Sequence, residues 1–99
     1  MYTILFSRDV ENDLKKISSF YRKRILDEIK KQLIHNPVTL TKNKKILVNL
    51  MPPWEADSMI WELRVGEYRV FYDVDDAGQE VFIRAIRKKP PGKTTEEIV

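Results

Sequence analysis

Apolar and polar residues alternate over the second half of the chain in a pattern that predicts three antiparallel strands, at about 60–65, 68–75 and 80–87. Gly66 and Glu67 stand between the first two strands, and a two-residue type II′ hairpin turn needs glycine at its first central position. A second turn is expected in the stretch "DDAGQ" before the last strand. The pattern therefore predicts a three-stranded meander whose first hairpin is very tight.

The first turn also fixes which side chains share a face of the sheet. One face carries three apolar pairs, Val65–Tyr68, Leu63–Val70 and Trp61–Tyr72. The other face places Arg64 directly opposite Arg69, although like charges facing each other across a ladder are destabilising. Glu62 lies on the same face, two residues from Arg64.

The last strand extends this arrangement. If Val74 pairs with Val81, then Ile83 and Ala85 join the apolar face, and Arg84 falls opposite Phe71 on the arginine face. The alternative register buries Arg84 beneath the helices, which is costly for an unpaired charge.

The first half of the chain predicts a buried opening strand at 2–6 and two amphipathic helices. Ser7 can cap the first helix, whose apolar positions are Val10, Leu14 and Ile17. Ser18 or Ser19 can cap the second, which carries Tyr21, Ile25, Ile29 and Leu33, widened by Leu26 and Ile34. Pro37 disfavours helical geometry in the residue before it and so ends the second helix.

The order β-α-α-β-β-β predicts a single α+β domain over residues 1–99, with the N-terminal strand and the helical hairpin packed on a small antiparallel sheet in two layers. The helices are expected on the Trp61/Leu63/Val70/Tyr72 face, which leaves the arginine face open. The connection at 38–59 is expected to lie across a sheet edge or to line a groove. In the tail, Thr94 and Glu97 can form a capping box for a final helical turn.

Composition narrows the class of protein. Hydrophobic residues make up 42% and charged residues 33%, as in an ordinary globular protein. No cysteine is present, which excludes a disulfide framework, and with a single histidine no metal site and no cofactor are expected. No phosphate-binding loop, dinucleotide fingerprint or serine nucleophile motif is found. No segment approaches membrane-spanning length, so a cytoplasmic protein is expected.

The net charge of +3 is unevenly distributed. Residues 1–50 hold eleven Lys/Arg against five Asp/Glu, and residues 51–99 hold seven against ten. This asymmetry favours a polyanionic partner, although a solvated lysine-rich face accounts for it equally well. The facing arginines likewise have two interpretations. An anion placed between them relieves their repulsion, or Glu62 neutralises them as a surface ion-pair network.

The stretch "WELRVGEYRVFYDVDD", followed by a strand and "AIRKK", resembles the RelE/ParE superfamily of toxins from type II toxin–antitoxin systems, and the resemblance covers nearly the whole chain. It implies a RelE-like fold, an antitoxin as partner, and one of two activities: ribosome-dependent cleavage of mRNA, or poisoning of DNA gyrase. An inactive relative that binds its antitoxin and represses the shared operon is a third alternative. The tail "PPGKTTEEIV" has no counterpart of the tyrosine that the endonuclease branch carries there, which favours the non-nuclease alternatives.

The resemblance also implies roles for individual residues. The arginine early in the third strand of the endonuclease branch corresponds to Arg69, and the basic residue past the last strand corresponds to Lys89. Glu62 takes a position that is basic in the best-known members and is the candidate general base. The candidate phosphate-binding residues are Arg64, Arg84, Arg87, Lys88, Lys44 and Lys45.

Overall fold

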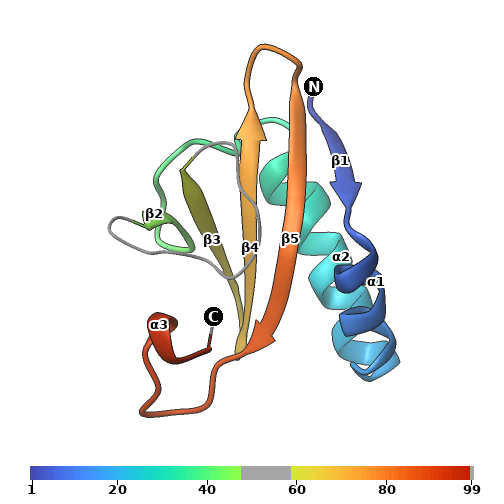
Figure 1. Ribbon diagram of the computed structural model, residues 1–99, viewed down its shortest axis with the longest axis vertical. Helices are drawn as coiled ribbons and strands as arrows, with labels where there is room; N and C mark the ends of the chain where they lie inside the picture. Colours follow the sequence, from blue (N-terminus) through green and yellow to red (C-terminus); the bar gives the residue numbers. More distant parts are fainter. Residues whose placement is uncertain (48–58, 99) are drawn as a thin grey trace.

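The computed structural model describes residues 1–47 and 59–98 of the chain. The elements follow in the order β1 (Thr3–Phe6), α1 (Arg8–Lys15), α2 (Ser19–Leu33), β2 (Lys44–Leu47), β3 (Ile60–Val65), β4 (Tyr68–Asp75), β5 (Glu80–Lys88) and α3 (Thr95–Ile98). The strands form one sheet in the order β1-β5-β4-β3-β2. Figure 1 shows α1 and α2 side by side against the sheet, with α3 well apart from them. The predicted α+β class is confirmed.

The predicted first hairpin is also confirmed. Gly66 has a φ of +59°, and Glu67 is not among the residues with positive φ, as a type II′ turn requires. β3 and β4 pair in the expected register, with Leu63 opposite Val70 and Arg64 opposite Arg69. The turn lies at the lower end of the sheet in Figure 1, close to the start of α2.

The helices pack on the predicted face of the sheet. Val10 of α1 and the α2 residues Ile25, Ile29 and Leu33 are buried in one cluster, together with Trp61, Leu63, Val65, Val70 and Tyr72 from the sheet. α1 begins where predicted, because the Ser7 side chain accepts a hydrogen bond from the Val10 N–H at 3.2 Å. Ser18 stands at the N-cap of α2 but makes no such side-chain bond.

The C-terminal end of α2 is capped by the side chain of Lys44, a role that was not predicted from the sequence. The Lys44 ammonium donates hydrogen bonds to the carbonyl oxygens of Gln32, at 3.1 Å, and Asn36, at 2.6 Å. These carbonyls belong to the last turn of α2 and to the segment just after it, where a cation also complements the helix dipole. Lys44 is only 2% exposed, and its burial lowers the pKa of the ammonium. The buried Lys44 ammonium is therefore bound to these carbonyls rather than placed to bind phosphate, as the sequence had predicted.

Tyr72 ties the centre of the sheet to the chain that follows α2. Its buried hydroxyl donates to the Pro37 carbonyl at 2.6 Å, and burial raises its pKa above the ordinary value of 10.0. Because the unfolded chain releases this proton first, the contribution of Tyr72 to stability is full below pH 10. It declines as the pH rises from there toward the raised folded pKa.

The Tyr72→Phe variant is expected to lose about 1 kcal/mol of unfolding free energy at neutral pH, because the Pro37 carbonyl loses its donor. It is also expected to lose less stability than the wild-type chain on going to alkaline pH. Urea unfolding of both proteins at neutral and alkaline pH measures the difference. Parallel pH profiles would contradict the assignment.

The opening strand differs from the prediction. β1 lies at the edge of the sheet and runs parallel to β5, so the sheet is mixed rather than wholly antiparallel. Leu5 and Phe6 are each 37% exposed, so β1 is not the buried strand that its apolar sequence suggested. β2 forms the other edge, antiparallel to β3. This agrees with the expectation that the 38–59 connection crosses a sheet edge, while its residues 48–58 lie outside the described part.

The predicted register of the last strand fails at one point. Val74 pairs with Val81 as expected, but a β-bulge between Phe71 and Tyr72 shifts the ladder, so that Phe71 pairs with Ala85. The shift leaves Arg84 without a residue directly opposite it and turns Ala85 to the second face. Arg84 instead forms an ion pair with the buried Asp73, with Nε and Oδ2 3.0 Å apart.

The second face of the sheet was predicted to be open. The structure shows that part of it is covered. A second cluster of Ile60, Phe71 and Ala85 is buried there, and Leu47 and Ile98 of α3 pack against it. The α3 turn forms as the sequence predicts, because Glu97 accepts a hydrogen bond from the Thr94 N–H at 3.2 Å. The hairpin end of this face leaves room for a ligand. In the described ranges no helix is long and apolar enough to cross a membrane.

Candidate anion-binding site

Two adjoining hollows lie at the hairpin end of the second face, and both are lined by Arg64, Arg69 and Lys89. We call this region the cationic hollow. Its larger part, about 260 Å³, extends along residues 90–92 to Glu67 and Lys93. Its smaller part, about 110 Å³, extends to Lys42, Lys45 and Glu62. Six cationic side chains and two carboxylates therefore line it, which makes it suited to an anionic ligand.

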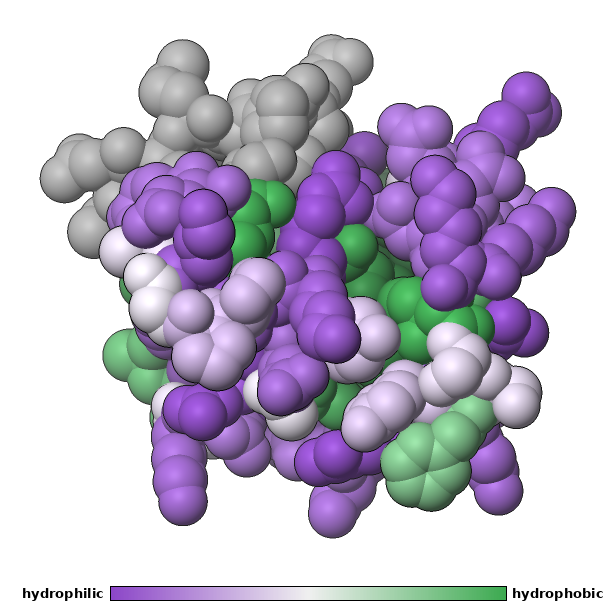
Figure 2. Space-filling view, turned by 90° about the horizontal axis from the view of Figure 1, so that it is seen from below, coloured by the Kyte–Doolittle hydropathy of each residue, from purple (hydrophilic) through white to green (hydrophobic). Residues whose placement is uncertain are grey.

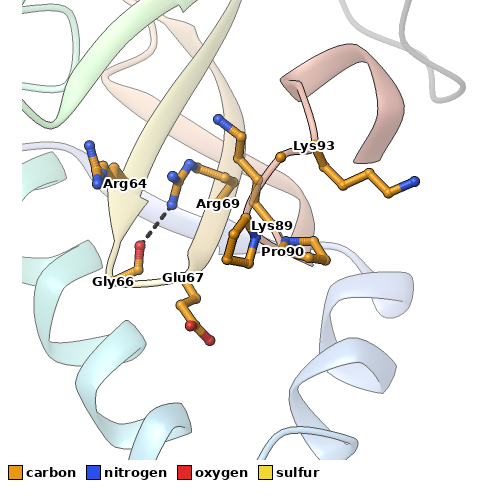
Figure 3. A pocket seen from close by; sticks show the side chains of 9 residues that line it. Arg64, Gly66, Glu67, Arg69, Lys89, Pro90 and Lys93 are labelled. Carbon is orange, nitrogen blue, oxygen red and sulfur yellow. Dashed lines mark hydrogen bonds between the residues drawn. The ribbon is translucent and has the colours of Figure 1, made fainter.

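The three shared residues come from different elements that the tight turn brings together. Arg64 lies on β3, Arg69 lies opposite it on β4, and Lys89 directly follows β5. The Lys89 N–H donates to the Glu67 carbonyl at 2.6 Å, which holds the segment after β5 against the turn. In Figure 3, Arg69 lies between Arg64 and Lys89, while the Glu67 carboxylate points away from them.

Arg69 is fixed in place on the floor of the hollow. The residue is 7% exposed, and its Nη1 donates to the carbonyl oxygens of Gly66 and Tyr68, each at 2.9 Å. Burial lowers the pKa of the Arg69 guanidinium, and the neighbouring charge of Arg64 acts in the same direction, while Glu62 opposes both. Arg64, in contrast, is exposed. The pair thus combines a rigid cation with one that is free to reach a ligand.

Glu62 lies beside Arg69 and is 4% exposed. Its Oε1 is 3.7 Å from Arg69 Nε and 3.8 Å from Lys45 Nζ. Its Oε2 accepts a hydrogen bond from the Thr95 hydroxyl at 2.8 Å. Glu62 therefore does pair with the arginine cluster, as one interpretation of the sequence held. However, it does so as a buried carboxylate rather than in a surface network.

Thr95 is one of the site residues that were not predicted from the sequence. The capping box at Thr94 and Glu97 predicted the short helix but gave no sign of where it packs. The turn at 90–92 brings α3 back onto the sheet, so that Thr95 is buried against Glu62. Lys93 and Lys42, which also line the hollow, were not among the predicted site residues.

The structure brings together five of the nine predicted site residues: Arg64, Arg69, Lys89, Lys45 and Glu62. The other four are not among the lining residues, and each pairs with another group. Arg84 pairs with Asp73, Lys88 is 3.8 Å from Glu67, and Lys44 closes α2. Arg87 lies opposite Arg69 in the ladder, but its Nη1 is bound to Asp13 of α1 at 2.8 Å.

This arrangement can bind phosphate or carboxylate groups without a metal ion. Arginine presents a planar fork of donors that matches these anions, and side chains fixed on strands are held more rigidly than those on loops. Within the described residues no group of three or more His, Cys, Asp or Glu side chains could hold a metal. Figure 2 looks onto this end of the molecule and shows a largely hydrophilic surface with a few apolar patches.

The fold and the hollow define a class: small two-layer α+β proteins with a cationic site at the end of a mixed sheet. The family model described as "ParE toxin of type II toxin-antitoxin system, parDE" matches residues 4–89. The chain therefore belongs to the ParE toxin family and is a RelE/ParE-like toxin of a type II toxin–antitoxin system. A comparison with curated proteins finds no match.

Solved structures support the same fold. The chain is similar to a chain of the archaeal RelE–RelB complex from Pyrococcus horikoshii OT3, with a TM-score of 0.70 and 24% identity, over 94% of this chain and 98% of that one. For the isolated E. coli RelE toxin the TM-score is 0.69 and the identity 19%, over 94% and 89%. For the toxin–antitoxin complex RelBE2 from Mycobacterium tuberculosis the TM-score is 0.61 and the identity 19%, over 89% of this chain and 98% of that one. At these identities the likeness concerns the fold.

Proposed function

We propose that this toxin is a ribosome-dependent mRNA endonuclease. The observation that carries the proposal is the placement of the Glu62 carboxylate beside Arg69, in a hollow that six cationic side chains line. Cleavage of RNA by its own 2′-hydroxyl needs a base, a cation that stabilises the charge of the phosphorane, and a donor for the leaving oxygen. The hollow offers residues for all three.

Each residue then has a stated role. Glu62 takes the proton of the 2′-hydroxyl, whose oxygen attacks the adjacent phosphorus and forms a cyclic phosphate while the bond to the 5′-oxygen breaks. Arg69, held by two carbonyls, stabilises the negative charge on the phosphorane oxygens. Lys89 donates a proton to the leaving 5′-oxygen, and Arg64 and Lys45 hold the flanking phosphates.

A second function, poisoning of DNA gyrase, is favoured by a different observation. The matching family model is named for the parDE system, and the tail lacks the tyrosine that the resemblance associates with the endonuclease branch. In that case the cationic hollow contacts gyrase or its DNA and performs no chemistry.

Two assays with the same purified protein distinguish the endonuclease from the gyrase poison. One is primer extension on mRNA from translating ribosomes, and the other is a gyrase DNA-cleavage assay. The endonuclease is expected to give cuts that follow the reading frame and to leave gyrase unaffected. Stabilised gyrase–DNA breaks with intact mRNA would overturn the proposal and support the second function.

We further propose an antitoxin as the physiological partner. Two of the solved structures that this fold resembles are described as a RelE–RelB complex and a toxin–antitoxin complex. An acidic segment that folds on binding could cover the cationic hollow. Co-expression with the product of the adjacent open reading frame is expected to restore growth and to yield a stable complex.

A further inference from the structure

Three aromatic rings form a contiguous group beside the hairpin turn, on the opposite face of the sheet from the cationic hollow. Phe20 and Tyr21, at the start of α2, meet edge to face, with ring centroids 5.2 Å apart. Tyr21 in turn lies 5.7 Å from Tyr68, the first residue of β4. Phe20 is 72% exposed and Tyr21 is 43% exposed. The core therefore accounts for Tyr68, which packs against it, but not for the other two rings.

Cations surround this group. Lys23 and Arg24 lie three and four residues after Phe20, on the same side of α2, and both are exposed. Lys88 pairs with Tyr68 in the β4–β5 ladder, and its side chain is 61% exposed. An exposed aromatic surface flanked by Lys and Arg is the arrangement by which proteins bind single-stranded nucleic acid, with bases on the rings and phosphates on the cations.

The aromatic group and the cationic hollow meet at the turn. The Arg24 guanidinium lies against Gly66, with its Nη1 3.2 Å from the point that a Cβ would occupy, and Gly66 also lines the hollow. Tyr68 directly precedes Arg69 in the chain. The one acidic side chain at the turn, Glu67, lies 3.8 Å from the Lys88 ammonium. A strand of nucleic acid leaving the hollow over the turn therefore meets cations and then the exposed rings.

We infer that Phe20 and Tyr21 form a stacking platform for a base of the single-stranded RNA whose phosphates occupy the cationic hollow. This inference rests on the proposed function, because it takes RNA as the ligand. It adds a second contact region on the opposite face of the sheet, which extends the RNA site beyond the nucleotide that is cut. The rings distinguish neither sequence nor sugar, so the platform adds affinity rather than base specificity.

The test is the binding of a short 2′-O-methyl oligonucleotide, which this chemistry cannot cleave, that carries 2-aminopurine. The fluorescence of this base falls when it stacks on an aromatic ring. The wild-type chain is expected to bind the oligonucleotide and to quench it at one position of a scanned series. Phe20→Ala is expected to weaken binding by at least about five-fold and to remove the quenching.

Two variants serve as controls. Phe20→Leu keeps an apolar side chain but not a ring and is expected to behave like Phe20→Ala. Leu40→Ala removes another large, 67% exposed apolar side chain and is expected to bind and quench like the wild-type chain. Thermal unfolding of all variants establishes that an effect on binding does not arise from loss of the fold.

The outcomes separate this inference from the proposed function. If the protein cleaves mRNA and Phe20→Ala leaves oligonucleotide binding and quenching unchanged, the stacking platform is overturned and the proposed endonuclease function stands. Loss of antitoxin or gyrase binding in Phe20→Ala, with RNA binding unchanged, would assign the rings to a protein partner and also overturn it. Failure of the wild-type chain to bind the oligonucleotide would overturn the platform, and only then would the RNA substrate itself be in doubt.

Discussion

Bacteria that express the Arg69→Ala variant are expected to grow normally, whereas the wild-type chain is expected to arrest growth. Arg69 is the buried cation on the floor of the cationic hollow, and two backbone carbonyls hold its guanidinium in place. Removal of one preorganised donor of this kind lowers catalytic rates by about 10²–10³-fold. Growth curves after induction, together with the amount of soluble toxin, measure the effect.

The Arg69→Ala variant is also expected to be less stable than the wild-type chain, because Glu62 loses the closer of its two cationic neighbours. A loss of about 1–3 kcal/mol is expected, since Glu62 keeps its bonds to Thr95 and Lys45. Arg84→Ala is the matched control, because Arg84 also neutralises a buried carboxylate, that of Asp73, but does not line the hollow. A soluble Arg69→Ala protein that is as toxic as Arg84→Ala would reject the role of Arg69.

The largest loss of stability is expected for Lys44→Met. This change keeps the apolar stem of the side chain but removes the ammonium that joins the carbonyls of Gln32 and Asn36. Two carbonyl acceptors, on the half-buried Gln32 and on Asn36, then lose a charged donor that is itself buried, which costs about 2–4 kcal/mol of unfolding free energy. A urea midpoint lower by roughly 1–2 M is the measurement that checks it.

Lys45→Met supplies the comparison within the same strand. The Lys45 side chain is 59% exposed and makes only a long ion pair with Glu62, so this variant is expected to lose less than about 1 kcal/mol. Equal midpoints for the two variants would mean that Lys44 does not close α2.

The fold could be predicted from the sequence wherever a local signal fixes the geometry. Gly66 determines the turn, the turn determines the register, and the alternation of side chains then assigns Trp61 and Leu63 to the helix face. The helices follow in the same way from their apolar spacing. These are interactions between residues that lie close together in the chain, or that a short turn brings together.

The errors arise where distant segments decide the outcome. The bulge between Phe71 and Tyr72 shifts the ladder at Arg84, which pairs with Asp73, and the alternation of residues in β5 does not predict that shift. The edge position of β1 follows from its parallel pairing with β5, which its apolar composition does not reveal.

The candidate site was predicted in outline for the same reason. The facing arginines followed from the turn, and Lys89 came from the resemblance. The burial of Glu62 depends on α3 returning to the sheet through the turn at 90–92, and the withdrawal of Lys44 depends on where α2 ends. Both are tertiary contacts between segments that the sequence treats as independent.

The central claim is that the cationic hollow binds the phosphates of a polyanion. Its most direct test is the salt dependence of binding to a single-stranded 2′-O-methyl oligonucleotide, for the wild-type chain, Arg64→Ala and Lys31→Ala, whose substituted lysine is exposed near the far end of α2. Each phosphate contact contributes about 0.7 to the slope of log affinity against log salt concentration. We predict a slope smaller by about that amount for Arg64→Ala and an unchanged slope for Lys31→Ala. Identical slopes for all three proteins would contradict the claim.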